Sequence, residues 1–210
     1  NRYIISPDFN IYVYIGRYLI RKMAEELHDE KIYKEYKAKE NQLKEKIESL
    51  WDEKNGLFLD RYVDGEKINV KTPGGMIPLF GIPDNRKIKK VVNHLFNPVE
   101  FWTRFPVPTL SLDDPYFNAE DEYQSYWNGR VWPNINWLLI EMLVRNKRLK
   151  EAKILIERTI EICTATGEVQ CFENYNPFTG HPYITHNIFN YGWGGIFNDV
   201  LLLSLIHISE

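Results

Sequence analysis

The sequence has few cysteines, no long apolar run and no excess of charge of either sign. Cys163 and Cys171 are its only cysteines, so no disulfide framework is implied and we expect two free thiols. No apolar stretch approaches the ~20 residues that a membrane-spanning helix needs. With 26 basic and 29 acidic side chains the net charge is -3. These absences exclude an integral membrane protein and give no reason to expect binding to nucleic acid or to an anionic membrane.

Apolar and aromatic side chains are plentiful instead. Of the 210 residues, 44% are hydrophobic, and the aromatics include 6 Trp, 13 Tyr and 11 Phe. This composition excludes a disordered or collagen-like chain, and a chain of ~200 residues can bury its core in a single domain. The aromatic content serves either a large core or a surface that stacks on rings. A neutral partner such as a sugar fits better than a charged polymer.

Both ends of the chain look incomplete. The sequence starts with Asn1, without a methionine or a signal peptide, so we expect a truncated front. Residues 204–210 resemble the translated read-through of a sequencing adapter. We therefore expect residues 1–203 to be part of one domain and residues 204–210 to be a non-native tail.

Apolar periodicity predicts about six helices in antiparallel pairs. The first carries a broad apolar stripe typical of a buried helix, whereas the second is amphipathic with a solvated charged face. A β-hairpin is expected over residues 57–70, with Asp64 and Gly65 at its centre. The predicted helices span residues 9–27, 31–51, 83–95, 133–145, 149–164 and 187–203.

Residues 126–133, which read YWNGRVWP, crowd aromatic rings and an arginine onto the turn before a helix. A sugar needs an aromatic platform for its C–H face and planar donors for its hydroxyls, and this turn supplies both. Taken alone, the same residues could equally be a hydrophobic contact with a structural arginine.

Residues 173–180, which read ENYNPFTG, place the carboxylate of Glu173 among amides and aromatic rings. A general base in hydrolysis is such a group, held by neighbours with room for one water. A lone loop glutamate is ordinarily a surface residue. Residues 191–195 read YGWGG. Their tryptophan, Trp193, either lines a pocket or fills a contact in the core.

Together with residues 97–102, which read NPVEFW, these ordered segments resemble glycoside hydrolase family 63 and its mannosylglycerate hydrolase-like relatives. The segment Asp8-Phe9-Asn10 fits as well, more weakly. The resemblance implies an all-α fold, an (α/α)6 toroid of which this chain holds roughly the C-terminal half. It also implies an inverting glycosidase that cleaves an α-glycosidic bond in an oligosaccharide or a glycosylglycerate.

By matching position, the resemblance makes Glu173 the general base. It implies that Asn174 and Tyr175 orient this base and that Trp193 closes the pocket. The residues that would line the sugar subsite are Tyr126, Trp127, Gly129, Arg130 and Trp132.

The general acid of such enzymes is an aspartate in an aromatic segment that would precede Asn1, so the chain alone should be inactive. An incomplete toroid would also expose inner helices and reduce solubility. We interpret the acidic residues near the turn as a solvated loop: Asp113, Asp114, Glu120, Asp121 and Glu122.

We expect no cofactor and no metal, because His181 and His186 have no further ligands at a suitable spacing. Two alternatives stay open. One is a carbohydrate-binding or helical scaffold module without chemistry. The other is a different (α/α)6 enzyme, namely a trehalase, a debranching-type glucosidase or a phosphorylase. Of these, the phosphorylase would need an anion site, for which Arg104 and Arg130 are the candidate residues.

Overall fold

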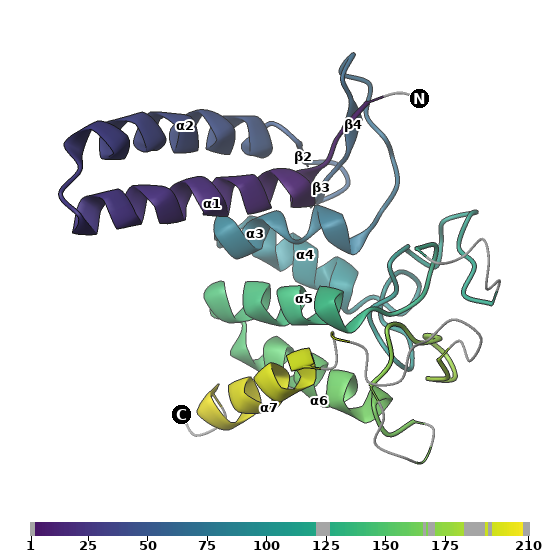
Figure 1. Cartoon of the computed structure of the whole chain (residues 1–210). Coiled ribbons are helices and arrows are strands. Elements are labelled where there is room, and N and C mark those ends of the chain that lie inside the picture. The colour runs from purple at the N-terminus through teal and green to yellow at the C-terminus, as the bar shows by residue number, and fades with distance from the viewer. Residues whose placement is uncertain are drawn as a thin grey trace.

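A computed structural model of the chain shows stacked helices with short strands near the N-terminal end of the first helix (Figure 1). It describes residues 3–120, 127–165, 167, 171–182, 192 and 195–207, with only the backbone given for residues 201 and 203–207. The elements are β1 (Ile4–Ile5), α1 (Pro7–Glu26), α2 (Glu30–Glu48), β2 (Trp51–Asp52), β3 (Leu57–Phe58), β4 (Arg61–Tyr62), η1 (Pro73–Gly75), α3 (Pro78–Gly81), α4 (Lys87–Leu95), α5 (Pro133–Arg145), α6 (Leu149–Ile162) and α7 (Gly195–His207).

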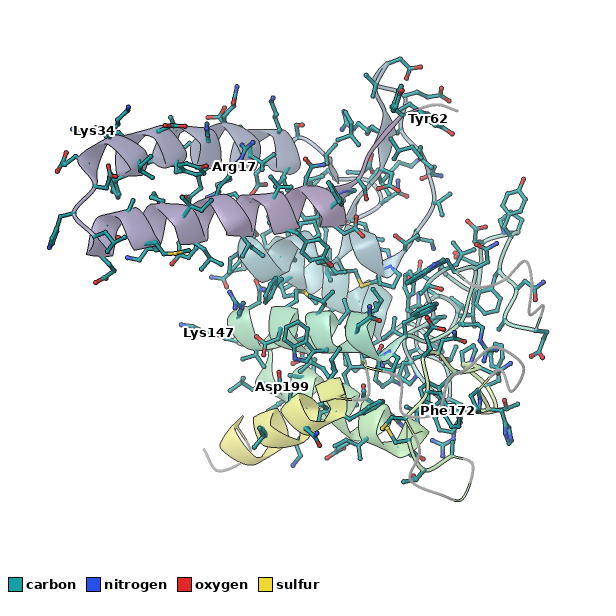
Figure 2. All side chains as sticks on the ribbon, in the orientation of Figure 1. Arg17, Lys34, Tyr62, Lys147, Phe172 and Asp199 are labelled. Atoms are coloured by element: carbon teal, nitrogen blue, oxygen red, sulfur yellow. The ribbon has the colours of Figure 1, made fainter. Side chains whose placement is uncertain are left out.

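The long loops gather at one end of the helices, on the right of Figure 1. Helices α1 and α5 both begin at this end and run away from it. In Figure 2, Phe172 lies among the loop side chains, whereas Lys34 lies at the far end of the α1–α2 pair. The described segments 127–132 and 171–182 therefore lie at the same end of the molecule.

Helices α1 and α2 form an antiparallel pair with defined ends. Pro7 occupies the first turn of α1, where its missing N–H costs nothing, and the Asp29 side chain caps α2 by accepting a backbone N–H at 3.0 Å. Between the helices, the Glu40 carboxylate accepts hydrogen bonds from Arg21 Nε at 2.6 Å and from the Tyr14 hydroxyl at 3.3 Å. This shared acceptor sets the register of the pair.

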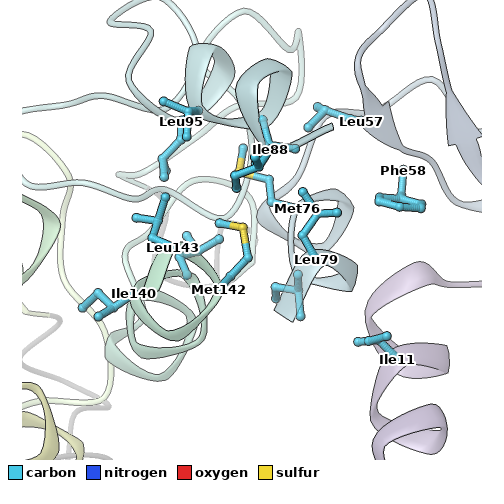
Figure 3. Packing of buried hydrophobic residues seen from close by; sticks show 14 of the residues in the cluster. Ile11, Leu57, Phe58, Met76, Leu79, Ile88, Leu95, Ile140, Met142 and Leu143 are labelled. Carbon is cyan, nitrogen blue, oxygen red and sulfur yellow. The ribbon is translucent and has the colours of Figure 1, made fainter. Parts of the chain in front are cut away.

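One apolar cluster joins the helices (Figure 3). Ile11 from α1, Leu79 from α3, Ile88 from α4 and Met142 with Leu143 from α5 are all 2% exposed or less. Burial of each such side chain stabilises the fold by about 1.5–3 kcal/mol. The helices that precede and follow the long loop are therefore parts of one core.

Asn146, at the end of α5, adds a polar connection inside this core. Its Nδ2 donates to the carbonyl oxygens of Leu79 at 2.9 Å and Met142 at 2.8 Å, and its Oδ1 accepts from the Asp84 N–H at 3.1 Å. The side chain thereby ties α5 to α3 and to the turn that precedes α4.

All six predicted helices are present, with differences at their ends. The helix predicted for residues 31–51 ends at Glu48, because Trp51 and Asp52 pair with β3 through a turn at Gly56, whose φ is +68°. The helix predicted from residue 83 begins at Lys87, because the Asp84 side chain accepts the first backbone N–H groups. Helix α7 is described from Gly195, and the predicted start at residue 187 lies outside the described residues, as do residues 183–191, 193 and 194.

The predicted hairpin is present in a shorter form. Around Asp64 and Gly65, the Tyr62 N–H donates to the Glu66 carbonyl and the Ile68 N–H donates to the Asp60 carbonyl, both at 2.9 Å. Strand β3 lies outside this hairpin and pairs with β2, while β4 also pairs with β1. The prediction that residues 57–70 form a single hairpin was wrong at its first strand.

The apolar stripe of α1 is not buried as predicted. Helix α1 packs on α2 and α3, and away from these contacts Phe9 is 69% exposed, Met23 57% and Leu27 79%. Only the side facing its partners, with Ile11 and Tyr14, is buried. This exposure is what an incomplete toroid is expected to show. In the described part of the chain, no helix has the length and apolarity to cross a membrane.

Candidate active site

Backbone hydrogen bonds join the two motif-bearing loops. The N–H of Val131 donates to the carbonyl of Tyr175 and the N–H of Tyr175 donates to the carbonyl of Val131, both at 2.9 Å. Isolated bridges extend this pairing to Pro108 on one side and Pro182 on the other. The tryptophan-rich turn and the loop that carries Glu173 therefore lie side by side, although more than forty residues separate them in the sequence.

Arg130 lies behind this junction and holds three segments together. Its side chain is 1% exposed, and it donates from Nε to Asn174 Oδ1 at 2.5 Å, from Nη1 to the Ala119 carbonyl at 2.9 Å and from Nη2 to the His181 carbonyl at 3.0 Å. A planar guanidinium suits three separate acceptors, which a lysine could not serve together. The contacts of Arg130 and Asn174 are thus made within the protein, and their roles at a sugar stay predictions.

Trp127 and Trp132 form a stacked pair whose ring centroids are 3.9 Å apart with 7° between the planes. Trp132 is 2% exposed and Trp127 is 51% exposed, so the inner ring supports the outer one. An exposed indole fixed in this way suits the C–H face of a sugar. Gly129 permits the turn, because its φ is +145° and a Cβ there would lie 2.7 Å from the Phe117 ring.

The loop that carries Glu173 is rigid. Tyr175 is 1% exposed and its hydroxyl oxygen accepts the Phe172 N–H at 2.7 Å, which closes the loop around Glu173. Burial raises the pKa of Tyr175, so the phenol stays protonated. The Asn176 side chain fixes the next turn by accepting backbone N–H groups from Phe178 and Thr179.

The Glu173 side chain is partly exposed. Within the described residues its carboxylate has no hydrogen-bond partner. A carboxylate that is free on a braced loop can contact a water or a substrate. Tyr126 and Trp193, the remaining predicted site residues, lie outside the described part of the chain.

A pocket of about 210 Å³ opens beside Trp127. Typical pockets for drug-sized ligands measure ~300–1,000 Å³, so this one suits a single small group. The Thr72–Gly74 segment is not among the motifs predicted to form the site, although the run Pro73-Gly74-Gly75 signals a close backbone approach. The walls are formed by Asp8, Thr72, Pro73, Gly74, Thr109, Trp127 and Ile135.

A charged cluster supports the segment before this pocket. Lys71 pairs with the buried Glu100 and, at 2.5 Å, with Asp113, while His94 Nδ1 lies 2.7 Å from Glu100 Oε2. Burial alone would raise the pKa of Glu100, but the hydrogen bonds from Lys71 and His94 outweigh it and hold that pKa below its usual value. The NPVEFW motif thereby anchors the segment that starts at Lys71.

The predicted acidic loop is only partly described. Asp113 contacts Lys71, Asp114 caps a local turn at Tyr116, and the Glu120 carboxylate accepts from Asn176 at 2.8 Å. Residues 121 and 122 lie outside the described part. Asp113 and Glu120 therefore connect loops in addition to facing solvent.

Arg104 and the potential metal ligands concern the predicted anion site of a phosphorylase and the predicted absence of a metal. Arg104 pairs with Glu161, at the end of α6. In the described part of the chain, His, Cys, Asp and Glu form no group of three that could hold a metal ion, and residue 186 lies outside it. Cys163 is buried, Cys171 is partly buried, and neither forms a disulfide within the described residues.

Comparison with known proteins agrees with this architecture. A family model described as a mannosylglycerate hydrolase MGH1-like glycoside hydrolase domain matches residues 2–194. A mannosylglycerate hydrolase of Thermus thermophilus is 35% identical over 100 residues, which are 45% of this chain and 22% of the relative. An uncharacterised protein of Borreliella burgdorferi is 36% identical over 138 residues, which are 65% of this chain and 28% of the relative.

Among solved structures, a GH63 mannosylglycerate hydrolase from Thermus thermophilus in complex with glucose superposes with a TM-score of 0.80 at 22% identity. The match covers 95% of this chain and 48% of that structure, so the chain spans about half of that protein and less than a third of these curated relatives. The predicted fold, an incomplete (α/α)6 toroid, is thereby confirmed. The resemblance seen in the motifs is confirmed as well, and the chain belongs to the MGH1-like glycoside hydrolase family.

Proposed function

We propose that the full-length protein is an inverting glycoside hydrolase that cleaves an α-glycosidic bond, with Glu173 as its general base. The observation that carries this proposal is the backbone pairing of Val131 with Tyr175. Through it, a supported indole platform and a braced carboxylate occupy neighbouring loops. A sugar bound on Trp127 would then lie within reach of a loop that can direct a water.

Inversion requires two carboxyl groups about 6.5–9.5 Å apart, because the water attacks from the face opposite the leaving group. Glu173 would activate that water, and the fixed turn around Tyr175 would keep the carboxylate in place. The general acid would come from a segment outside this chain. The 210-residue chain by itself should therefore show no turnover.

The substrate class that we propose is an oligosaccharide or a glycosylglycerate. The exposed face of Trp127 and the small pocket beside it suit one sugar ring with its hydroxyls. Two of the relatives named above are mannosylglycerate hydrolases. Net charge near zero is compatible with a neutral ring as the group that is recognised.

The test uses the full-length enzyme and its Glu173→Gln variant, assayed against mannosylglycerate and α-linked glucosides by NMR, which reports the anomer released first. We expect the wild type to release the inverted anomer, and Glu173→Gln to lose turnover while it still binds sugar. Glu157→Gln, on the exposed side of α6, is the control and should remain active. Retained activity in Glu173→Gln would remove the base assignment.

Other outcomes separate the alternatives. Sugar binding without turnover in the wild type would favour a carbohydrate-binding module. Release of a sugar phosphate only in the presence of inorganic phosphate would identify a phosphorylase. Turnover of trehalose alone would identify a trehalase on the same toroid.

A further inference from the structure

The pocket beside Trp127 contains a carboxylate oxygen that has no partner in the described protein. Asp8, in the first turn of α1, accepts hydrogen bonds at Oδ1 from the Ser6 hydroxyl and, at 2.7 Å, from the Phe9 N–H. Within the described residues no donor reaches its Oδ2. This oxygen faces Gly74, where a Cβ would lie 3.4 Å from it.

Of the two threonines that line the pocket, Thr109 is already engaged. The Thr109 hydroxyl donates to the Arg130 carbonyl at 3.1 Å and accepts the Gly129 N–H at 3.2 Å. Oδ2 of Asp8 is therefore the strongest acceptor that the pocket offers, because an ionised oxygen makes stronger hydrogen bonds than a hydroxyl does. It shares the pocket with the exposed indole of Trp127.

Two side chains near Asp8, those of Tyr12 and Asp60, have raised pKa values. Burial raises the pKa of Tyr12 to about 12, and the charge of Asp8 adds to the effect. Burial also raises the pKa of Asp60, again with a contribution from Asp8, while the Ser6 hydroxyl opposes that rise. Asp8 thus lies close to two partly buried titratable side chains.

We propose that Asp8 Oδ2 accepts a hydrogen bond from a hydroxyl of the sugar whose ring packs on Trp127. This rests on the proposed function, which assigns no role to Asp8. A helix-capping role alone would use only Oδ1, since a single oxygen already accepts the first-turn N–H. The two roles therefore use different atoms of one side chain, and Asp8→Asn separates them. An asparagine keeps an oxygen for the Phe9 N–H but presents an NH2 group, which cannot accept, to the pocket.

The experiment measures binding of methyl α-mannopyranoside and methyl α-glucopyranoside to the full-length protein by calorimetry. Trp127→Ala tests the pocket itself. Asp29→Asn is the matched control, because Asp29 also accepts a first-turn N–H, at the start of α2. We expect Asp8→Asn to weaken binding about tenfold to 100-fold, the effect of losing a hydrogen bond to a charged group, with Asp29→Asn at wild-type affinity. Both variants should have similar thermal midpoints.

Monodeoxy glycosides identify the hydroxyl concerned. The glycoside that lacks this hydroxyl should bind the wild type as weakly as the complete sugar binds Asp8→Asn. It should also bind the wild type and Asp8→Asn with equal affinity.

The outcomes separate this inference from the proposed function. Wild-type affinity in Asp8→Asn, with binding lost in Trp127→Ala, would overturn the role of Asp8 and leave the hydrolase proposal standing. Weakened binding in Asp8→Asn supports it even where Glu173→Gln remains active. Absence of sugar binding by the wild type overturns both.

Discussion

Replacing Arg130 by lysine tests whether one buried guanidinium holds the candidate active site together. Three acceptors on three segments depend on it: Asn174 Oδ1 and the carbonyl oxygens of Ala119 and His181. A lysine keeps the charge, but its single side-chain nitrogen cannot reach all three acceptors, and we expect two of the three hydrogen bonds to be lost. At about 1–2 kcal/mol for each buried acceptor left unpaired, two lost bonds cost roughly 2–4 kcal/mol.

That cost should appear locally, because the same loops carry the Val131–Tyr175 pairing. Hydrogen exchange of the full-length protein, resolved to peptides that contain residues 131 and 175, measures the opening free energy of this pairing. A change of roughly 2–4 kcal/mol accelerates exchange about 30-fold to 1,000-fold, since each 1.4 kcal/mol is a factor of ten.

The matched control is Arg158→Lys, because Arg158 pairs with Glu161 at a partly exposed position where lysine can substitute. Peptides from α2 serve as an internal reference and should exchange at the wild-type rate in both variants. Unchanged exchange at residues 131 and 175 in Arg130→Lys would refute the view that this side chain holds the loops.

Two further changes have signs that the structure determines. Gly75→Ala should lower the thermal midpoint strongly, because the new Cβ would lie 2.4 Å from the Phe58 carbonyl oxygen. Gly16 lies in the middle of α1 with no atom near the position of a Cβ, so Gly16→Ala should raise stability by about 0.5–1 kcal/mol. Equal thermal midpoints of the two variants would contradict this difference. Glu100 has a lowered pKa in the fold, so its ionised form contributes stability above its ordinary pKa, and this contribution is lost as pH falls through the lowered value. The thermal midpoint of Glu100→Gln should therefore lie below that of the wild type at pH 7 and approach it in acid, and a gap independent of pH would show that Glu100 acts by shape alone.

Long helices were predictable from the sequence because their signals are local and repeated. Pro133 begins α5 as its position indicates, and the apolar spacing that follows continues to Arg145. Helix α3, of four residues, is too short for a periodic pattern, and the end of α2 depends on a strand partner at Leu57. Such features depend on contacts that a single stretch of sequence does not contain.

The candidate site was predictable in its motifs but not in its supports. Order and spacing singled out Trp127 and Glu173, whereas the pocket beside Trp127 needs Asp8 and Thr72, which are distant in the sequence and meet only after α1 packs on η1. Arg130 carries the same lesson. Its residue type suggested contact with a sugar, yet the acceptors that surround it come from three segments that no local pattern connects.

The common direction of α1 and α5 has an electrostatic consequence for the pocket. Each helix presents its N-terminal end there, with Asp8 and Ile135 in the first turns. A helix N-terminus is equivalent to about half a positive elementary charge, so the two ends together offset about the one negative charge that Asp8 carries. The helix ends therefore weaken the field of the Asp8 carboxylate in the pocket, which lowers the repulsion that a ligand bearing a carboxylate would meet there.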